Sequence, residues 1–115
     1  MNTANYKEMM AELRTEYLEA FQQKFQTIND FFDQKDWYSI ELEYHKLKGT
    51  GSTYGVPEVT QLCEQLERVC REKKQIERIV VDQSIELLTA IREKYLNDKE
   101  FDLSSNATFL SIKNL

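Results

Sequence analysis

The sequence predicts an all-α protein: an antiparallel up-down-up-down four-helix bundle with an N-terminal helical extension and an irregular C-terminal tail. Three observations lead to this prediction. The 115 residues include only one proline and three glycines, and Glu, Gln, Lys and Leu, which favour helix, are common. Apolar residues recur at alternating spacings of three and four, which is typical of helices with one buried face. The connections are very short, so consecutive helices are expected to be antiparallel neighbours.

The first helical pattern covers residues 3–32. Its periodicity is stronger in the second half, and the first dozen residues form either a separate short helix or an extension. The apolar stripe consists of Tyr6, Met10, Leu13, Tyr17, Phe21, Phe25, Ile28 and Phe32. A polar turn at residues 33–36 follows, and Asp36 is a candidate N-cap for the next helix.

Three further helices are expected, at residues 37–54, 57–72 and 75–97. Gly55 ends the first of them and Pro57 opens the second, in the usual order of glycine after a helix and proline at a helix start. The stripe of the first is Trp37, Ile40, Tyr44, Leu47 and Tyr54, with Gly51 in register. The stripe of the second is Val59, Leu62, Cys63, Leu66, Val69 and Cys70. The candidate core of the third is Ile76, Ile79, Val80, Ile85, Leu88, Ile91 and Tyr95.

The chain divides into a bundle at residues 1–97 and a tail or linker at residues 98–115. The tail has scattered apolar residues among Ser, Asn and Thr and shows no helical period. It is a linker, a disordered end or a segment that packs on the bundle, and the sequence leaves these alternatives open.

Composition excludes several functions. The net charge of −5 and a pI near 4.9 argue against a nucleic-acid binder. A single histidine and the lack of a Cys-x-x-Cys motif argue against a metal site. Cys63 and Cys70 lie two turns apart on one apolar face, too far to bridge, so we expect buried free thiols, which suit a reducing compartment. Without a signal peptide or a long apolar run, we expect a cytoplasmic, monomeric protein that does not enter a membrane.

The most informative stretch is HKLKGTGSTYG, residues 45–55, which holds the only histidine and all three glycines. His45 lies roughly 125° from the centre of the apolar stripe of its helix, so it should reach solvent at the edge of the core. Lys48 and Gly49 share its face. Glycine inside a helix costs about 1 kcal/mol relative to alanine, and clearance for a partner beside the imidazole is a physical reason for that cost. A lone histidine on a helix is more often a solvated surface residue.

The string HKLKG, residues 45–49, resembles the core motif of histidine-containing phosphotransfer (HPt) domains, and Gly55, Leu62, Leu66 and Glu67 fit the next helix of that family. The resemblance covers residues 13–96. It implies a phosphorelay intermediate in two-component signalling, in which His45 exchanges a phosphoryl group with the aspartate of a response-regulator receiver domain or with a sensor histidine kinase. The chain would need no cofactor of its own, because Mg²⁺ would belong to the receiver. It has no ATP-binding motif and would not be an enzyme that phosphorylates itself.

The resemblance also implies roles for particular residues. Lys48 would neutralise phosphoryl oxygens, Gly49 would leave room for the partner, and Glu67 would orient the imidazole. The alternative for Glu67 is an ordinary solvated glutamate. Tyr38, Leu42, Ser52 and Arg71 are candidate partner-binding residues around His45; their alternative is scattered surface positions.

A second function from another class stays open. The chain could be a non-catalytic helical-bundle adaptor that docks a receiver or a partner helix without being phosphorylated. An intermediate version is a degenerate HPt-like domain, although the presence of His45, Lys48 and Gly49 argues against it. The sequence does not name the cognate kinase or receiver or the direction of phosphate flow. It also does not decide between a free-standing protein and a fragment of a larger kinase.

Overall fold

The computed structural model describes residues 3–115, with side chains from residue 5, and this part of the chain is helical with no strand. The helices are α1 (Thr3–Glu19), α2 (Phe21–Asp33), α3 (Trp37–Thr53), α4 (Pro57–Lys73), α5 (Arg78–Leu96), the short 3-10 helix η1 (Leu103–Ser105) and α6 (Ala107–Lys113). No helix in the described residues is long and apolar enough to cross a membrane. The expected all-α class is confirmed.

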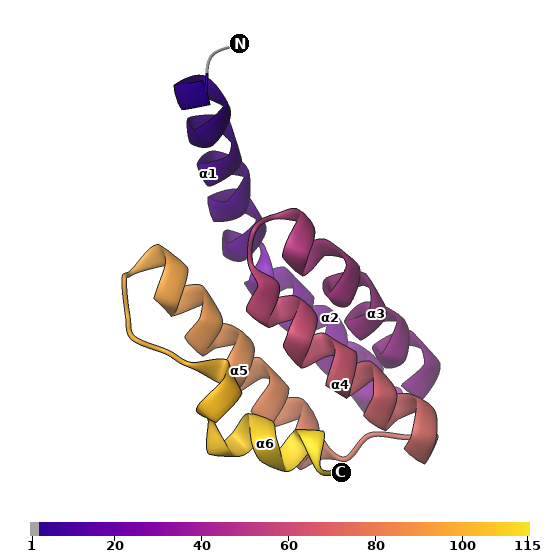
Figure 1. The fold of residues 1–115 in the computed structure, drawn as a ribbon. Helices are drawn as coiled ribbons and strands as arrows, with labels where there is room; N and C mark the ends of the chain where they lie inside the picture. The colour runs from indigo at the N-terminus through magenta and orange to yellow at the C-terminus, as the bar shows by residue number, and fades with distance from the viewer. Residues whose placement is uncertain (1–2) are drawn as a thin grey trace.

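Helices α2 to α5 form the body of the protein (Figure 1). Helix α3 packs on α2 and most extensively on α4, and α5 closes the bundle by contacting both α2 and α4. Their buried faces share one apolar core, whose largest fully buried side chains include Tyr44, Phe21, Leu18, Ile28 and Ile40. The helical bundle is therefore as expected, and its full up-down-up-down order stays a prediction.

Helix α1 extends beyond the bundle. Figure 1 shows it leading away from the other helices towards the N-terminus, and the chain breaks from it into α2 at Ala20. Tyr17 and Leu18 are buried, but Tyr6 is 52% exposed and Leu13 is also exposed. Only the second half of the predicted stripe is thus buried, because the bundle ends near Arg14. The Arg14 guanidinium lies over the ring of Tyr95, close to the end of α5.

The boundaries of α3 and α4 follow the expected signals. The Asp36 carboxylate accepts a hydrogen bond from the Ser39 amide and caps α3. Gly55 has a φ of 77°, the left-handed conformation that favours glycine after a helix. Pro57 is in the first turn of α4. Helix α5 begins later than predicted, and Ile79 is 58% exposed rather than part of the core. Ile76 is buried, as predicted, although it lies in the connection that precedes the helix.

The tail differs from the irregular segment that was expected. Residues 98–102 are irregular, but η1 and α6 follow, and Leu103, Phe109 and Ile112 are buried in the main core. Helix α6 lies across α4 and α5 (Figure 1). It is too short, at seven residues, to show a period in the sequence. The Asn106 side chain caps its start and the Arg68 guanidinium donates to carbonyls at its end. Of the three alternatives, the tail packs on the bundle.

Candidate functional site

His45 lies in the middle of α3, and its side chain is 59% exposed, as its position on the helical wheel predicts. Its Nδ1 atom is 3.3 Å from each carboxylate oxygen of Glu67 on α4. An ionised carboxylate only accepts hydrogen bonds, so Nδ1 is the protonated nitrogen in this contact. In the neutral ring, Nε2 then carries the free electron pair. The site therefore offers a nucleophilic nitrogen whose tautomer is fixed by a neighbouring helix.

Glu67 is 5% exposed and faces three positive or hydrogen-bonding groups. Lys48 Nζ lies 2.9 Å from its Oε2 atom, and the Arg71 guanidinium, one turn further along α4, donates to Oε1. Burial by itself would raise the pKa of Glu67, but the hydrogen bonds from Lys48 and His45 outweigh it and hold that pKa below its usual value. The carboxyl stays ionised, which is what a permanent acceptor for the imidazole requires.

Gly49 has open space around it. A Cβ atom built on this residue would meet no atom outside its own turn within 4 Å. Packing therefore does not demand glycine here, although glycine costs a helix about 1 kcal/mol. The clearance that Gly49 leaves is on the outer surface of α3, one turn after His45.

Gly51 has the opposite surroundings. A Cβ atom there would lie 2.6 Å from Thr60 Oγ1 and 2.7 Å from the Thr60 amide nitrogen, both on α4. Gly51 is buried and allows α3 and α4 to approach closely next to the site. Thr60 was not among the residues predicted from the sequence. The only signal for this contact is a glycine in the apolar stripe of α3, where a larger core residue would be expected.

The four predicted partner-binding residues do not share one environment. Tyr38 is 75% exposed, and Leu42 and Ser52 are exposed too, so all three are available to a partner. Arg71 is exposed, but its guanidinium is held by Glu67. A shallow hollow of about 300 Å³ between α3 and α4 is lined by Tyr38, Glu41 and Arg71, among others. The structure thus joins Arg71 to the histidine site and leaves the other three around it.

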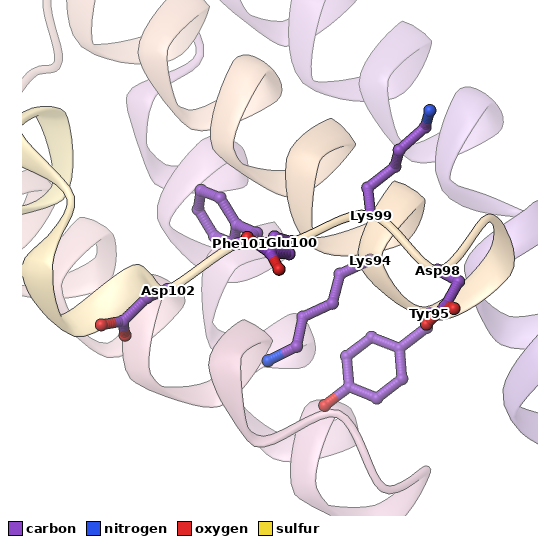
Figure 2. A pocket seen from close by; sticks show the side chains of 7 residues that line it. All are labelled: Lys94, Tyr95, Asp98, Lys99, Glu100, Phe101 and Asp102. Atoms are coloured by element: carbon purple, nitrogen blue, oxygen red, sulfur yellow. The ribbon is translucent and has the colours of Figure 1, made fainter.

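A larger hollow lies elsewhere. It has a volume of about 790 Å³ and opens at the end of α5, where Lys94, Tyr95 and Phe101 contribute to its lining (Figure 2). Lys94 Nζ and Tyr95 Oη donate to the buried carboxylate of Glu58, at 2.7 and 2.6 Å. The rest of its lining places Lys99 among the acidic residues Asp98, Glu100 and Asp102, so side chains of both charges face a ligand there. We do not place the function there.

The fold and this site define a helical-bundle protein that presents one exposed histidine, backed by a carboxylate and two cations. The family model described as "Hpt domain" matches residues 12–94, which is most of the chain. The chain therefore belongs to the Hpt domain family, as its HKLKG motif indicated. Neither the curated proteins nor the solved structures include a significant match.

Family membership gives the general function. Hpt domains are phosphotransfer modules of histidine–aspartate phosphorelays in two-component signalling, and they have no ATP site of their own. Their partners as a family are receiver domains and histidine kinases. The matched region includes α3 and α4 and therefore every residue of the site described above.

Proposed function

We propose that His45 is the phosphoryl acceptor and donor of this Hpt domain. The observation that carries the proposal is the contact of His45 Nδ1 with the buried carboxylate of Glu67, which leaves Nε2 as the nucleophile on an exposed surface. A histidine that served only as surface would need no buried, ionised partner on another helix.

The transfer uses a simple exchange of bonds. The electron pair of Nε2 attacks the phosphorus of a receiver's aspartyl phosphate, and the bond between phosphorus and the aspartate oxygen breaks with its electron pair leaving on that carboxylate. Nδ1 keeps its proton, so the ring becomes positively charged as the new P–N bond forms. The Glu67 carboxylate stabilises that charge. The reverse sequence returns the phosphoryl group, and a histidine kinase is the other candidate donor.

Lys48 and Arg71 supply positive charge to the same site. Phosphoryl transfer depends mainly on positioning and on stabilising charge at the phosphoryl oxygens. Lys48 lies between Glu67 and the surface beside His45, so its ammonium group can turn from the carboxylate to an incoming phosphoryl group. Arg71 then remains on Glu67 and keeps the carboxylate paired. Because two cations contact the Glu67 carboxylate, one of them can bind the phosphoryl group while the other stays on Glu67.

The direct test is phosphorylation by a small donor. Wild type incubated with phosphoramidate should gain one acid-labile phosphoryl group by intact mass, and His45→Gln should gain none while keeping its helical circular dichroism. Lys46→Gln is a matched control, because Lys46 is a neighbouring exposed residue of α3 that does not contact Glu67. Equal labelling of wild type and His45→Gln would remove His45 from this role.

The clearance at Gly49 has its own test. Gly49→Gln should accept phosphate from phosphoramidate at the wild-type rate, because nothing packs against this position. Transfer to or from a receiver domain should fall about tenfold or more, since the longer side chain stands where the partner's active site approaches. Unchanged receiver transfer would mean that Gly49 does not provide clearance.

The alternative function is an adaptor that docks a receiver without accepting phosphate. It would retain the exposed Tyr38 and Leu42 beside His45 as its contact surface. A folded wild type that binds a receiver but gains no phosphoryl group from phosphoramidate or from a phosphorylated receiver would favour it.

A further inference from the structure

The Thr60 hydroxyl connects α4 to the backbone of α3 at the turn that carries Lys48 and Gly49. It donates to the Lys48 carbonyl at 2.8 Å and accepts from the Ser52 amide at 2.8 Å. It also accepts from the Ser52 hydroxyl at 3.1 Å. A hydroxyl has one donor and two acceptor positions, so all of its hydrogen-bonding capacity is used in this contact.

Lys48 and Ser52 are four residues apart, so their carbonyl and amide are the natural partners of one helical hydrogen bond. Thr60 contacts both groups of that pair. Other hydroxyls also donate to carbonyls of this turn, but they belong to α3 itself: Thr50 to Lys46 and Thr53 to Gly49. Such bonds move with the helix. The Thr50 hydroxyl also lies 2.9 Å from the Tyr17 hydroxyl of α1. Thr60 is therefore the residue in this group that fixes the turn relative to α4, the helix that carries Glu67.

The contact has the same register as the pairing of His45 with Glu67. Seven residues separate Thr60 from Glu67 on α4, and seven separate His45 from Ser52 on α3, which runs the opposite way. Seven residues are about two turns, so Thr60 and Glu67 share one face of α4. A shift or rotation of α3 that broke the Thr60 contact would also move His45 and Lys48 relative to Glu67.

Gly51 makes the contact possible. Any Cβ atom at this position would lie against the hydroxyl and the backbone of Thr60 and about 3.0 Å from the Val56 carbonyl. The glycine and the threonine thus form a matched pair, one providing the space and the other the hydrogen bonds.

We infer that Thr60, packed on Gly51, is a positioning residue that holds the Lys48 turn of α3 in place for phosphoryl transfer at His45. This inference rests on the proposed role of His45 and Lys48. Thr60 does not touch the reacting atoms. It acts by fixing the backbone from which the Lys48 side chain reaches both Glu67 and the phosphoryl oxygens.

The test compares Thr60→Val with Thr60→Ser. Valine has the shape of threonine without the hydroxyl, and the freed Lys48 carbonyl and Ser52 amide can bond to each other, so the variant should fold. Its rate of phosphoryl gain from phosphoramidate should fall about five- to tenfold, the range expected for one lost network of neutral hydrogen bonds. Thr60→Ser should stay within about twofold of wild type. Thr53→Val, which loses a hydroxyl bond inside α3 only, is the matched control and should also stay near wild type.

A double-mutant cycle separates positioning from general loosening. Combined with Lys48→Met, Thr60→Val should cause almost no further loss, because its effect passes through Lys48. The inference is overturned if Thr60→Val reacts as fast as wild type, or if it slows Lys48→Met by the same factor as it slows wild type. Failure of the proposed function would look different: wild type itself would gain no phosphoryl group, or the gain would survive His45→Gln, and the inference would fall with it.

Discussion

Helix α4 carries two buried glutamates, nine residues apart, that have similar burial and different surroundings. Glu58 accepts from Lys94 and Tyr95, which are adjacent residues of α5. Glu67 faces His45 and Lys48 of α3 together with Arg71 of α4. In both cases burial would raise the pKa of the carboxyl, and hydrogen bonds from its partners lower it below the usual value. The pKa values of the two carboxyl groups are thus lowered by the same kind of interaction.

The difference lies in what the partners can do next. Glu58 is contacted by one cation, Lys94, and one phenol, Tyr95, so its charge is balanced. If Lys94 moved away, the buried carboxylate would be left without a counter-charge. Glu67 has two cations and an imidazole that is mostly in solvent. The Glu67 region therefore has one more cation than its carboxylate needs for charge balance. That excess positive charge lies beside an exposed nucleophile and can bind an anion. The comparison teaches that the number of cations around the carboxylate, more than its burial, separates the region of the proposed site from the Glu58 region.

The largest expected effect is on the rate of phosphoryl acceptance, and it compares the lysine of each region, Lys48 beside Glu67 and Lys94 beside Glu58. Lys48→Met should slow phosphoryl acceptance at His45 about a hundredfold, since removal of one group that stabilises charge in a transition state commonly costs this much. Lys94→Met should leave the rate within about twofold, because the Lys94 ammonium pairs with Glu58, nine residues from Glu67 on α4. Both rates are measured with phosphoramidate by intact mass. Equal slowing by the two variants would mean that the regions do not differ in function.

The second prediction concerns stability, for which we expect the Glu58 region to matter more than the Glu67 region. Glu58→Ala should lower the free energy of unfolding by about 2 kcal/mol, because it leaves Lys94 and the Tyr95 hydroxyl without their common acceptor. Glu67→Ala should cost about 1 kcal/mol, because the Arg71 and His45 side chains are largely in solvent and can be hydrated. Urea unfolding followed by circular dichroism measures both. A larger loss for Glu67→Ala would show that this carboxylate is mainly structural.

Much of the Glu67 region could be predicted because its key residues are close together on one helix. The 100° rotation per residue places His45, Lys48 and Gly49 on one face and away from the core, and the structure agrees. Glu67 lies on another helix, and its selection needed the family resemblance. The contact of Glu67 with His45 could be expected in this way, but the contact of Arg71 with the same carboxylate could not. The partner-binding role of Arg71 stays a prediction.

The remaining features depend on distances between helices, which periodicity does not contain. The close approach at Gly51 brings Thr60 into the backbone of α3, and an apolar stripe says only which face is buried. For the same reason the stripe of α1 did not show where the bundle stops beside it. Helix α6 was missed because Phe109 and Ile112 are its only buried side chains, and two positions make no period.

The smallest expected effect is the pH dependence of stability, and it tests whether both carboxylates are held ionised. The pKa of each is lower in the folded protein than its usual value of 4.5. Between the two values the unfolded chain binds more protons, so stability rises with pH there. The contribution of each glutamate is fully present above about pH 4.5 and is lost as pH falls through the lower, folded pKa.

Glutamine keeps the size of the side chain and removes this titration, so it provides the measurement. The difference in unfolding free energy between wild type and Glu67→Gln should shrink as pH falls from about 6 to about 3, and the difference for Glu58→Gln should do the same. The double variant Glu58→Gln, Glu67→Gln should still lose some stability as pH falls, because hydrogen bonds from Ser104 and Ser105 also lower the pKa of Asp102. If the Glu58→Gln difference shrinks while the Glu67→Gln difference stays constant with pH, Glu67 is not held as an ion by Lys48 and His45. The two regions would then differ already in their resting charge, and the proposed support of the imidazole by a permanent carboxylate would be wrong.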